Sequence, residues 1–225
     1  MKRILSLFII VLLYSCGNSK NSQTFIDQVT GKYLFNSDES IEIYFVKNEL
    51  SVKWRGRDDI KPLKVNDSTF YMKEINEKII FKSTPEIAIT LAPKREHKGE
   101  IYHFKKLSLE EKTPGEYLRN NQFDKALAGY LSIKKRDSLD KTIRESTLNS
   151  LGYKALGVKK YEEAIQIFKI NIALYPEKSN TYDSLGDAYW KIKDTANAVK
   201  NYKKALSINP ENRRAKRFLK RHKLD

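Results

Sequence analysis

Two segments of the sequence repeat one pattern at a fixed spacing. Residues 151–176 read LGYKALGVKKYEEAIQIFKINIALYP, and residues 185–210 read LGDAYWKIKDTANAVKNYKKALSINP. Five kinds of residue recur 34 positions apart: leucine (Leu151, Leu185), glycine (Gly152, Gly186), alanine (Ala164, Ala198), an aromatic residue (Phe168, Tyr202) and proline (Pro176, Pro210). Small residues let two helices approach closely, the aromatic residue fills the space between them, and proline cannot continue a helix. The pattern predicts two stacked helical hairpins.

A period of 34 residues with these offsets resembles the tetratricopeptide repeat, a helix–turn–helix unit. On this resemblance we expect regular repeats at residues 145–178 and 179–212, within a repeat domain at 109–225. A capping helix is expected at 212–224, because the end of a repeat stack needs a polar outer face. Repeats of this family are scaffolds, so the resemblance implies protein binding rather than a reaction.

A degenerate unit at about 116–141 precedes the two regular repeats. The sequence NQFDKA at 121–126 is similar to KKYEEA at 159–164, and Tyr130 stands where Phe168 does, but the spacing is 38 residues. Two regular repeats and one degenerate unit are close to the smallest stack that is stable.

Residues 25–108 have a hydrophobic period of two instead. Ile41, Ile43 and Phe45 alternate with Glu42 and Tyr44, and similar alternation occurs at residues 50–54 and 87–91. About eight short strands separated by Asn-, Asp- and Gly-containing turns predict an antiparallel meander or a small barrel. The expected fold class is therefore α+β: an N-terminal antiparallel β-meander or small barrel followed by an α-helical tetratricopeptide solenoid.

The first residues are typical of a secretion signal. Met1, Lys2 and Arg3 precede an apolar run at residues 4–14, which is too short to span a bilayer. The sequence LYSC at 13–16 resembles the bacterial lipoprotein box, which implies removal of a signal peptide at 1–15 and acylation of Cys16 with palmitate or a similar chain. An ordinary signal peptide with an incidental cysteine is the alternative. Cys16 is the only cysteine, so no disulfide forms within one molecule.

Residues 16–24 are short and polar and are predicted to be a tether between the lipid anchor and the β-domain. Asn18, Ser19 and Lys20 follow the cysteine without the acidic cluster that resembles a surface-export signal in some bacteria with two membranes. We therefore expect a lipid-anchored protein of the bacterial cell envelope, in the outer membrane and facing the periplasm. Nucleic acid is then excluded as a partner, because the protein leaves the cytoplasm.

The β-domain also has a family resemblance. Gly31-Lys32-Tyr33 and the later NELSV at 48–52 look like the small β-module found C-terminal to serine hydrolases of the β-lactamase type. This resemblance implies an accessory domain, and it raises the alternative that the chain is an accessory or regulatory subunit of a separately encoded serine hydrolase.

The sequence contains no constellation of residues that predicts catalysis. Its three histidines lack metal-ligand spacing, and Ser-x-x-Lys matches at Ser132 and Ser138 lack the companion motifs of a serine hydrolase. We therefore expect no enzyme activity, no cofactor and no metal site.

A protein or peptide partner is expected along the first helices of the repeats. Asn and Tyr side chains there would bond a peptide backbone, the paired Asp183 and Asp187 would favour a basic segment, and Trp190 could belong to the core or the groove. This set does not resemble the Lys/Asn clamp that some repeats use for terminal carboxylates. The predicted partner-binding residues are Asn149, Tyr153, Asn180, Asp183, Asp187 and Trp190.

The formal net charge of +15 allows two interpretations. The first is a lysine-rich solvated surface, with the basic last helix as a solvating cap. The second is an anionic ligand or partner, and in this case the contacts would come from Arg213, Arg214, Arg217, Lys220 and Arg221. The function that the sequence favours is a non-catalytic, membrane-anchored protein–protein interaction module, and an anionic-ligand-binding lipoprotein is an alternative.

Overall fold

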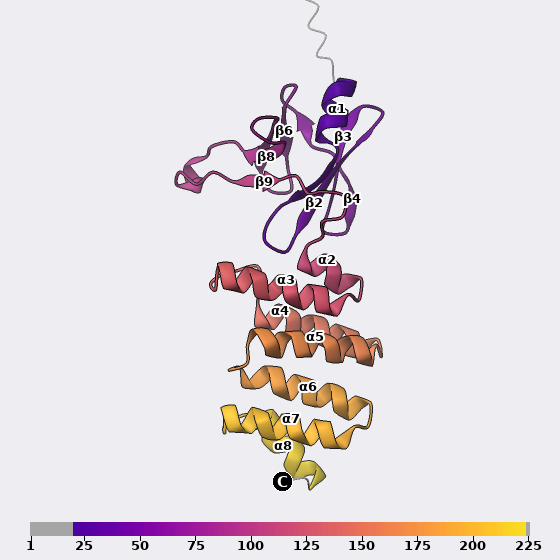
Figure 1. Cartoon of the computed structure of the whole chain (residues 1–225), viewed down its shortest axis with the longest axis vertical. Coiled ribbons are helices and arrows are strands. Elements are labelled where there is room, and N and C mark those ends of the chain that lie inside the picture. Colours follow the sequence, from indigo (N-terminus) through magenta and orange to yellow (C-terminus); the bar gives the residue numbers. More distant parts are fainter. Residues whose placement is uncertain (1–19, 224–225) are drawn as a thin grey trace, which may run out of the picture. The chain divides into compact units, whose positions relative to one another are not determined.

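The computed structural model describes residues 20–223, and the figures show their secondary structure (Figure 1). Cys16 and the predicted signal peptide lie outside the described residues. Contacts divide the chain into two compact units, of which one comprises the chain up to Thr30 with Glu42–Tyr102 and the other comprises Gly31–Ile41 with the chain from His103 onward. Within residues 20–223, no helix has the length and apolar content needed to cross a membrane.

The strands form two antiparallel sheets in chain order, so the predicted meander is confirmed. The first sheet has the order β1 (Gly31–Leu34), β2 (Ser40–Val46), β3 (Glu49–Trp54) and β4 (Arg57–Ile60). The second has the order β5 (Leu63–Lys64), β6 (Thr69–Met72), β7 (Glu77–Lys82), β8 (Ala88–Leu91) and β9 (His103–Lys105).

Turn chemistry and alternation explain these strands. Lys47 and Asn48 have φ values of 51° and 65°, which suits the tight turn between β2 and β3. Across that turn Ile43 pairs with Val52, and both are fully buried. The short helix α1 (Gln23–Val29) places Phe25 against Phe81, with ring centroids 5.5 Å apart, and completes an aromatic core.

Seven helices follow within the described residues. They are α2 (Pro114–Arg119), α3 (Phe123–Arg136), α4 (Glu145–Gly157), α5 (Tyr161–Leu174), α6 (Ser179–Lys191), α7 (Thr195–Ile208) and α8 (Arg213–His222). Helices α2/α3, α4/α5 and α6/α7 form successive hairpins, and α8 packs on α7 (Figure 1). The predicted fold class, antiparallel sheets followed by a helical solenoid, is confirmed.

The repeated glycines allow the close helix approach that the sequence predicts. A Cβ atom on Gly152 would lie 2.3 Å from the Phe168 ring, and one on Gly186 would lie 3.1 Å from the Tyr202 ring. Both aromatic side chains are fully buried. Each glycine therefore makes room for the aromatic residue of the following helix.

Asp38, in the segment between β1 and β2, is joined to the first helices. Its Oδ1 accepts a hydrogen bond from the Gly115 backbone N–H at 2.6 Å, and its Oδ2 accepts one from the Tyr130 hydroxyl at 3.2 Å. Burial raises the pKa of Asp38 to about 6, although these two hydrogen bonds oppose the increase.

Candidate functional site

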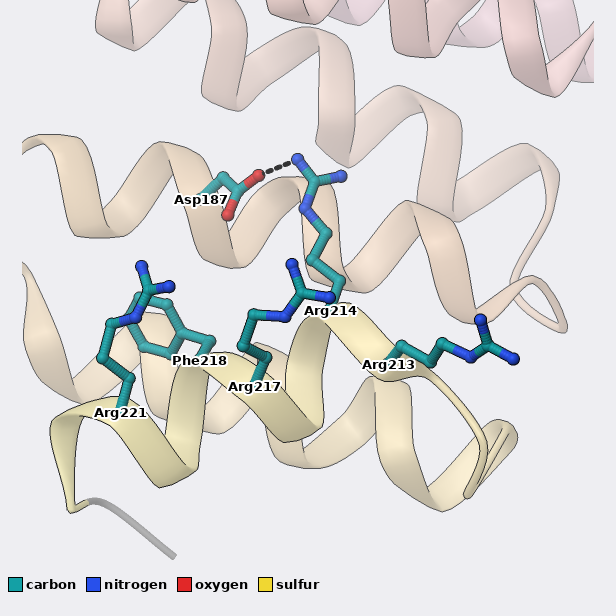
Figure 2. A pocket seen from close by; sticks show the side chains of 6 residues that line it. All are labelled: Asp187, Arg213, Arg214, Arg217, Phe218 and Arg221. Atoms are coloured by element: carbon teal, nitrogen blue, oxygen red, sulfur yellow. Dashed lines mark hydrogen bonds and ion pairs between the residues drawn. The ribbon is translucent and has the colours of Figure 1, made fainter.

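The centre of the candidate site is Asp187, in the middle of α6. Its carboxylate accepts a hydrogen bond from the Tyr153 hydroxyl of α4 at 2.7 Å, and it also accepts one from the Tyr202 hydroxyl of α7. The Arg214 guanidinium of α8 forms an ion pair with the same carboxylate (Figure 2). Four helices therefore meet at one side chain.

Asp183, one turn earlier on α6, is engaged in the same way. Only 3% of the residue is exposed, and its Oδ2 accepts a hydrogen bond from Asn212 Nδ2 at 2.7 Å. Arg214 also reaches its Oδ1, at 3.5 Å. Burial raises the pKa of Asp183, whereas the Asn212 amide and the Arg214 charge lower it.

Asn212 fixes the start of α8 against α6. Its Oδ1 accepts the backbone N–H groups of Arg214 and Ala215, at 3.1 and 3.0 Å, and so caps the helix. Its amide group also donates to the Ser179 hydroxyl at 2.7 Å. One side chain thus positions the helix that brings Arg214 to the two aspartates.

Arg214 supplies the basic group that the paired aspartates favour. Its guanidinium lies 5.0 Å from the centroid of the Tyr153 ring, in a cation–π contact, while it pairs with Asp183 and Asp187. The cation at this acidic pair is therefore part of the chain itself. We call the surface formed by Tyr153, Asp183, Asp187, Trp190, Arg214 and Phe218 the Asp187 face.

Of the predicted partner-binding residues, four lie together and two lie apart. Tyr153, Asp183 and Asp187 belong to the network around Arg214, and Trp190 packs beside it, with its ring 4.9 Å from Phe218 and 4.4 Å from His222. Asn180 instead donates to Glu145 Oε1 at 2.7 Å. The Asn149 side chain is half-buried, and its Oδ1 has no hydrogen-bond partner among the described residues.

Two adjoining hollows open at the Asp187 face. The arginine hollow, about 300 Å³, is lined by Asp187, Arg213, Arg214, Arg217, Phe218 and Arg221 (Figure 2). The aromatic hollow, about 630 Å³, has Tyr153, Tyr161, Trp190, Phe218 and His222 among its lining residues, together with Lys191 and Arg221. Asp187, Phe218 and Arg221 line both hollows, so a ligand could occupy the two together.

The roles of Arg214, Asn212 and Tyr202 could not be assigned from the pairing rules used on the sequence. Arg214 stands only as one of several cations on the last helix, 27 residues beyond Asp187. The 34-residue period does contain a signal, because Arg213 follows Ser179 by 34 positions. Continuing the period by one helix places α8 where the first helix of a further repeat would lie, next to α6.

Comparison with known proteins supports this architecture. Residues 179–212 match the family model described as Tetratricopeptide repeat. These residues are a tetratricopeptide repeat. Its two helices are α6 and α7, and Asp183, Asp187 and Trp190 lie on the first of them. No curated protein matches the chain.

Solved tetratricopeptide structures are also similar to this chain, at low sequence identity. The first TPR domain of the human RPAP3 protein is 19% identical over 48% of this chain and 82% of its own, with a TM-score of 0.34. The OM64 TPR domain of Arabidopsis is 18% identical over 49% of this chain and 88% of its own, with a TM-score of 0.34. MamA is 21% identical over 48% of this chain and 60% of its own, with a TM-score of 0.30.

Proposed function

We propose that the chain is a non-catalytic protein-interaction module that binds a segment of a partner protein at the Asp187 face. The observation that carries this proposal is the aromatic hollow. Its walls combine Tyr153 from α4, Tyr161 from α5, Trp190 from α6 and His222 from α8. Tyrosine, tryptophan and arginine are the residues that most often dominate the energy of protein interfaces.

The rigidity of the walls supports the same proposal. Trp190 is held between α6 and α8 by ring contacts, and Tyr153 by hydrogen bonds to Asp187 and Ser184. Side chains that are already ordered lose little conformational entropy when a partner binds. The tetratricopeptide repeat therefore presents a preformed surface rather than one that a partner must organise.

The test is capture of partners by crosslinking in intact cells, followed by affinity purification of the full chain. We expect a discrete partner with the wild type and its loss with Tyr161→Ala/Lys191→Ala, which alters the lining of the aromatic hollow. The matched control is Lys169→Ala/Lys200→Ala, at two exposed positions outside both hollows. Equal capture by all three proteins would contradict the proposal.

We further propose that the module is held in the bacterial cell envelope by acylation of Cys16, with the repeats in the periplasm. Two or more acyl chains give stable anchoring, because each buried methylene contributes about 0.8 kcal/mol. Mature protein should carry acyl mass, and Cys16→Ala should move the chain to the soluble fraction. A Cys16→Ala protein that stays in the membrane, and a native protein without acyl mass, would overturn the anchoring.

The β-strand unit is proposed to be an accessory module, on the resemblance of its first strands to modules that accompany β-lactamase-type hydrolases. This role predicts that the captured partner is a serine hydrolase. Capture of a partner of another class would leave the interaction module intact and remove the hydrolase assignment.

A further inference from the structure

The charges that remain available at the Asp187 face are positive. Arg213, Arg217 and Arg221 recur at every fourth position of α8 and line the arginine hollow. Figure 2 shows Arg217 and Arg221 extending on the same side of α8 as Arg214. Among residues 20–223, no carboxylate forms an ion pair with Arg213, Arg217 or Arg221.

The negative charges at this face are already neutralised. Asp187 accepts hydrogen bonds from two tyrosine hydroxyls and the charge of Arg214, and Asp183 is buried beneath Asn212 and Arg214. A basic segment would have to displace Arg214 to reach either carboxylate. An acidic segment meets unpaired guanidinium groups without displacing anything.

We propose that the arginine hollow binds an acidic segment of a partner protein. Carboxylates of that segment pair with Arg217 and Arg221, and an apolar side chain next to them enters the aromatic hollow beside Trp190. Guanidinium groups suit this task because they bind carboxylates through two parallel hydrogen bonds. The inference rests on the proposed function and names the chemistry of the partner at the same site.

The packing of α8 favours a protein segment over a lipid surface. A helix that lies on a membrane inserts its apolar face between the lipids. On α8 that face is already covered, since Ala215 and Leu219 are buried in a cluster with Ala198, Tyr202 and Ala205 of α7. Phe218 stacks on Tyr202, with ring centroids 4.0 Å apart. The arginines surround a hollow rather than a free amphipathic helix.

The test is fluorescence polarisation with two labelled peptides and the full chain, which carries Cys16→Ser throughout so that acylation is absent from every sample. One peptide has glutamates flanking a single leucine, and the other has glutamine in place of each glutamate. The charge-reversal variant is Arg217→Glu/Arg221→Glu. Its matched control, Lys200→Glu/Lys203→Glu, makes the same change in net charge at exposed positions of α7 outside both hollows.

We expect the acidic peptide to bind at least about tenfold more tightly than the neutral one, with Kd rising as salt screens the charges. Arg217→Glu/Arg221→Glu should lose at least about tenfold in affinity, and Lys200→Glu/Lys203→Glu should lose less than about twofold. Arg217→Lys/Arg221→Lys, which keeps the charge but not the bidentate geometry, should fall between them. Circular dichroism checks that all variants are folded.

Equal binding of the two peptides, or equal losses in the two charge-reversal variants, would overturn the inference. A parallel measurement uses vesicles of phosphatidylglycerol and phosphatidylethanolamine. Binding to these vesicles that depends on Arg217 and Arg221, without binding of the acidic peptide, would assign the arginines to lipid headgroups instead. If crosslinking in cells still captures a partner through the aromatic hollow, the proposed function stands while the acidic chemistry is rejected.

Discussion

Arg214 is predicted to stabilise the last repeat by neutralising two carboxylates. The perturbation is Arg214→Leu, which keeps much of the apolar stem and removes the charge. Asp183 and Asp187 would then lose their common cation, with side-chain exposures of 4% and 23%. Asn212, Tyr153 and Tyr202 would remain as their hydrogen-bond donors.

The expected cost lies between two limits. Breaking a fully buried ion pair costs about 3–5 kcal/mol, and an exposed pair contributes about 0–1 kcal/mol. The Arg214 side chain is 45% exposed, and both aspartates keep other donors. We therefore expect a loss of about 2 kcal/mol in the free energy of unfolding, or about 4–8 °C in Tm.

The assay is urea unfolding of the full chain, followed by circular dichroism in the helical region. Arg217→Leu, one turn further along α8 and without an ion pair among the described residues, should change stability by less than about 0.5 kcal/mol. In an Asp187→Asn background, the cost of Arg214→Leu should fall by about 1 kcal/mol, since the closer of its two partners has lost its charge. The same cost in both backgrounds would refute the proposed electrostatic role of Arg214.

Two further predictions concern the packing and the pH dependence of the fold. Gly152→Ala should cost about 2–3 kcal/mol, because the new Cβ would lie 2.3 Å from the fully buried Phe168 ring; Gly157→Ala, with nothing within 4 Å, is the control, and equal unfolding midpoints would contradict the packing argument. Burial raises the pKa of Asp38 from 3.8 to about 6, so the folded state holds this proton more tightly than the unfolded state. Stability relative to Asp38→Asn should therefore fall as pH rises from about 4 to about 6, by at most about 3 kcal/mol, and parallel pH profiles of the two proteins would exclude this role.

The helical fold could be predicted because its signal is local and repeated. Gly152 and Phe168 recur as Gly186 and Tyr202, and the structure shows each glycine against the ring of its partner. The β-meander followed from period-two alternation and turn residues such as Asn48. The division of the strands into two sheets was beyond the sequence pattern, because alternation identifies the faces of a strand but not where pairing stops.

The candidate site could be predicted only in part, for a physical reason. Helical spacing places Asp183, Asp187 and Trp190 on one face of α6, but it does not show what covers that face. The cover is Arg214, whose approach depends on the packing of α8 and the cap at Asn212. The result changes the expected partner, because an acidic pair that favours a basic segment is already matched within the chain.

The central claim is that the Asp187 face binds a partner protein. The most direct measurement places a photo-crosslinking amino acid at Lys191, an exposed position that lines the aromatic hollow, in the full chain in intact cells. The same group at Lys169, an exposed position of α5 outside both hollows, is the reference. We predict a discrete protein adduct from position 191 that is absent from position 169 and is lost with Arg217→Glu/Arg221→Glu. Identical adducts from both positions, or none from position 191, would contradict the claim.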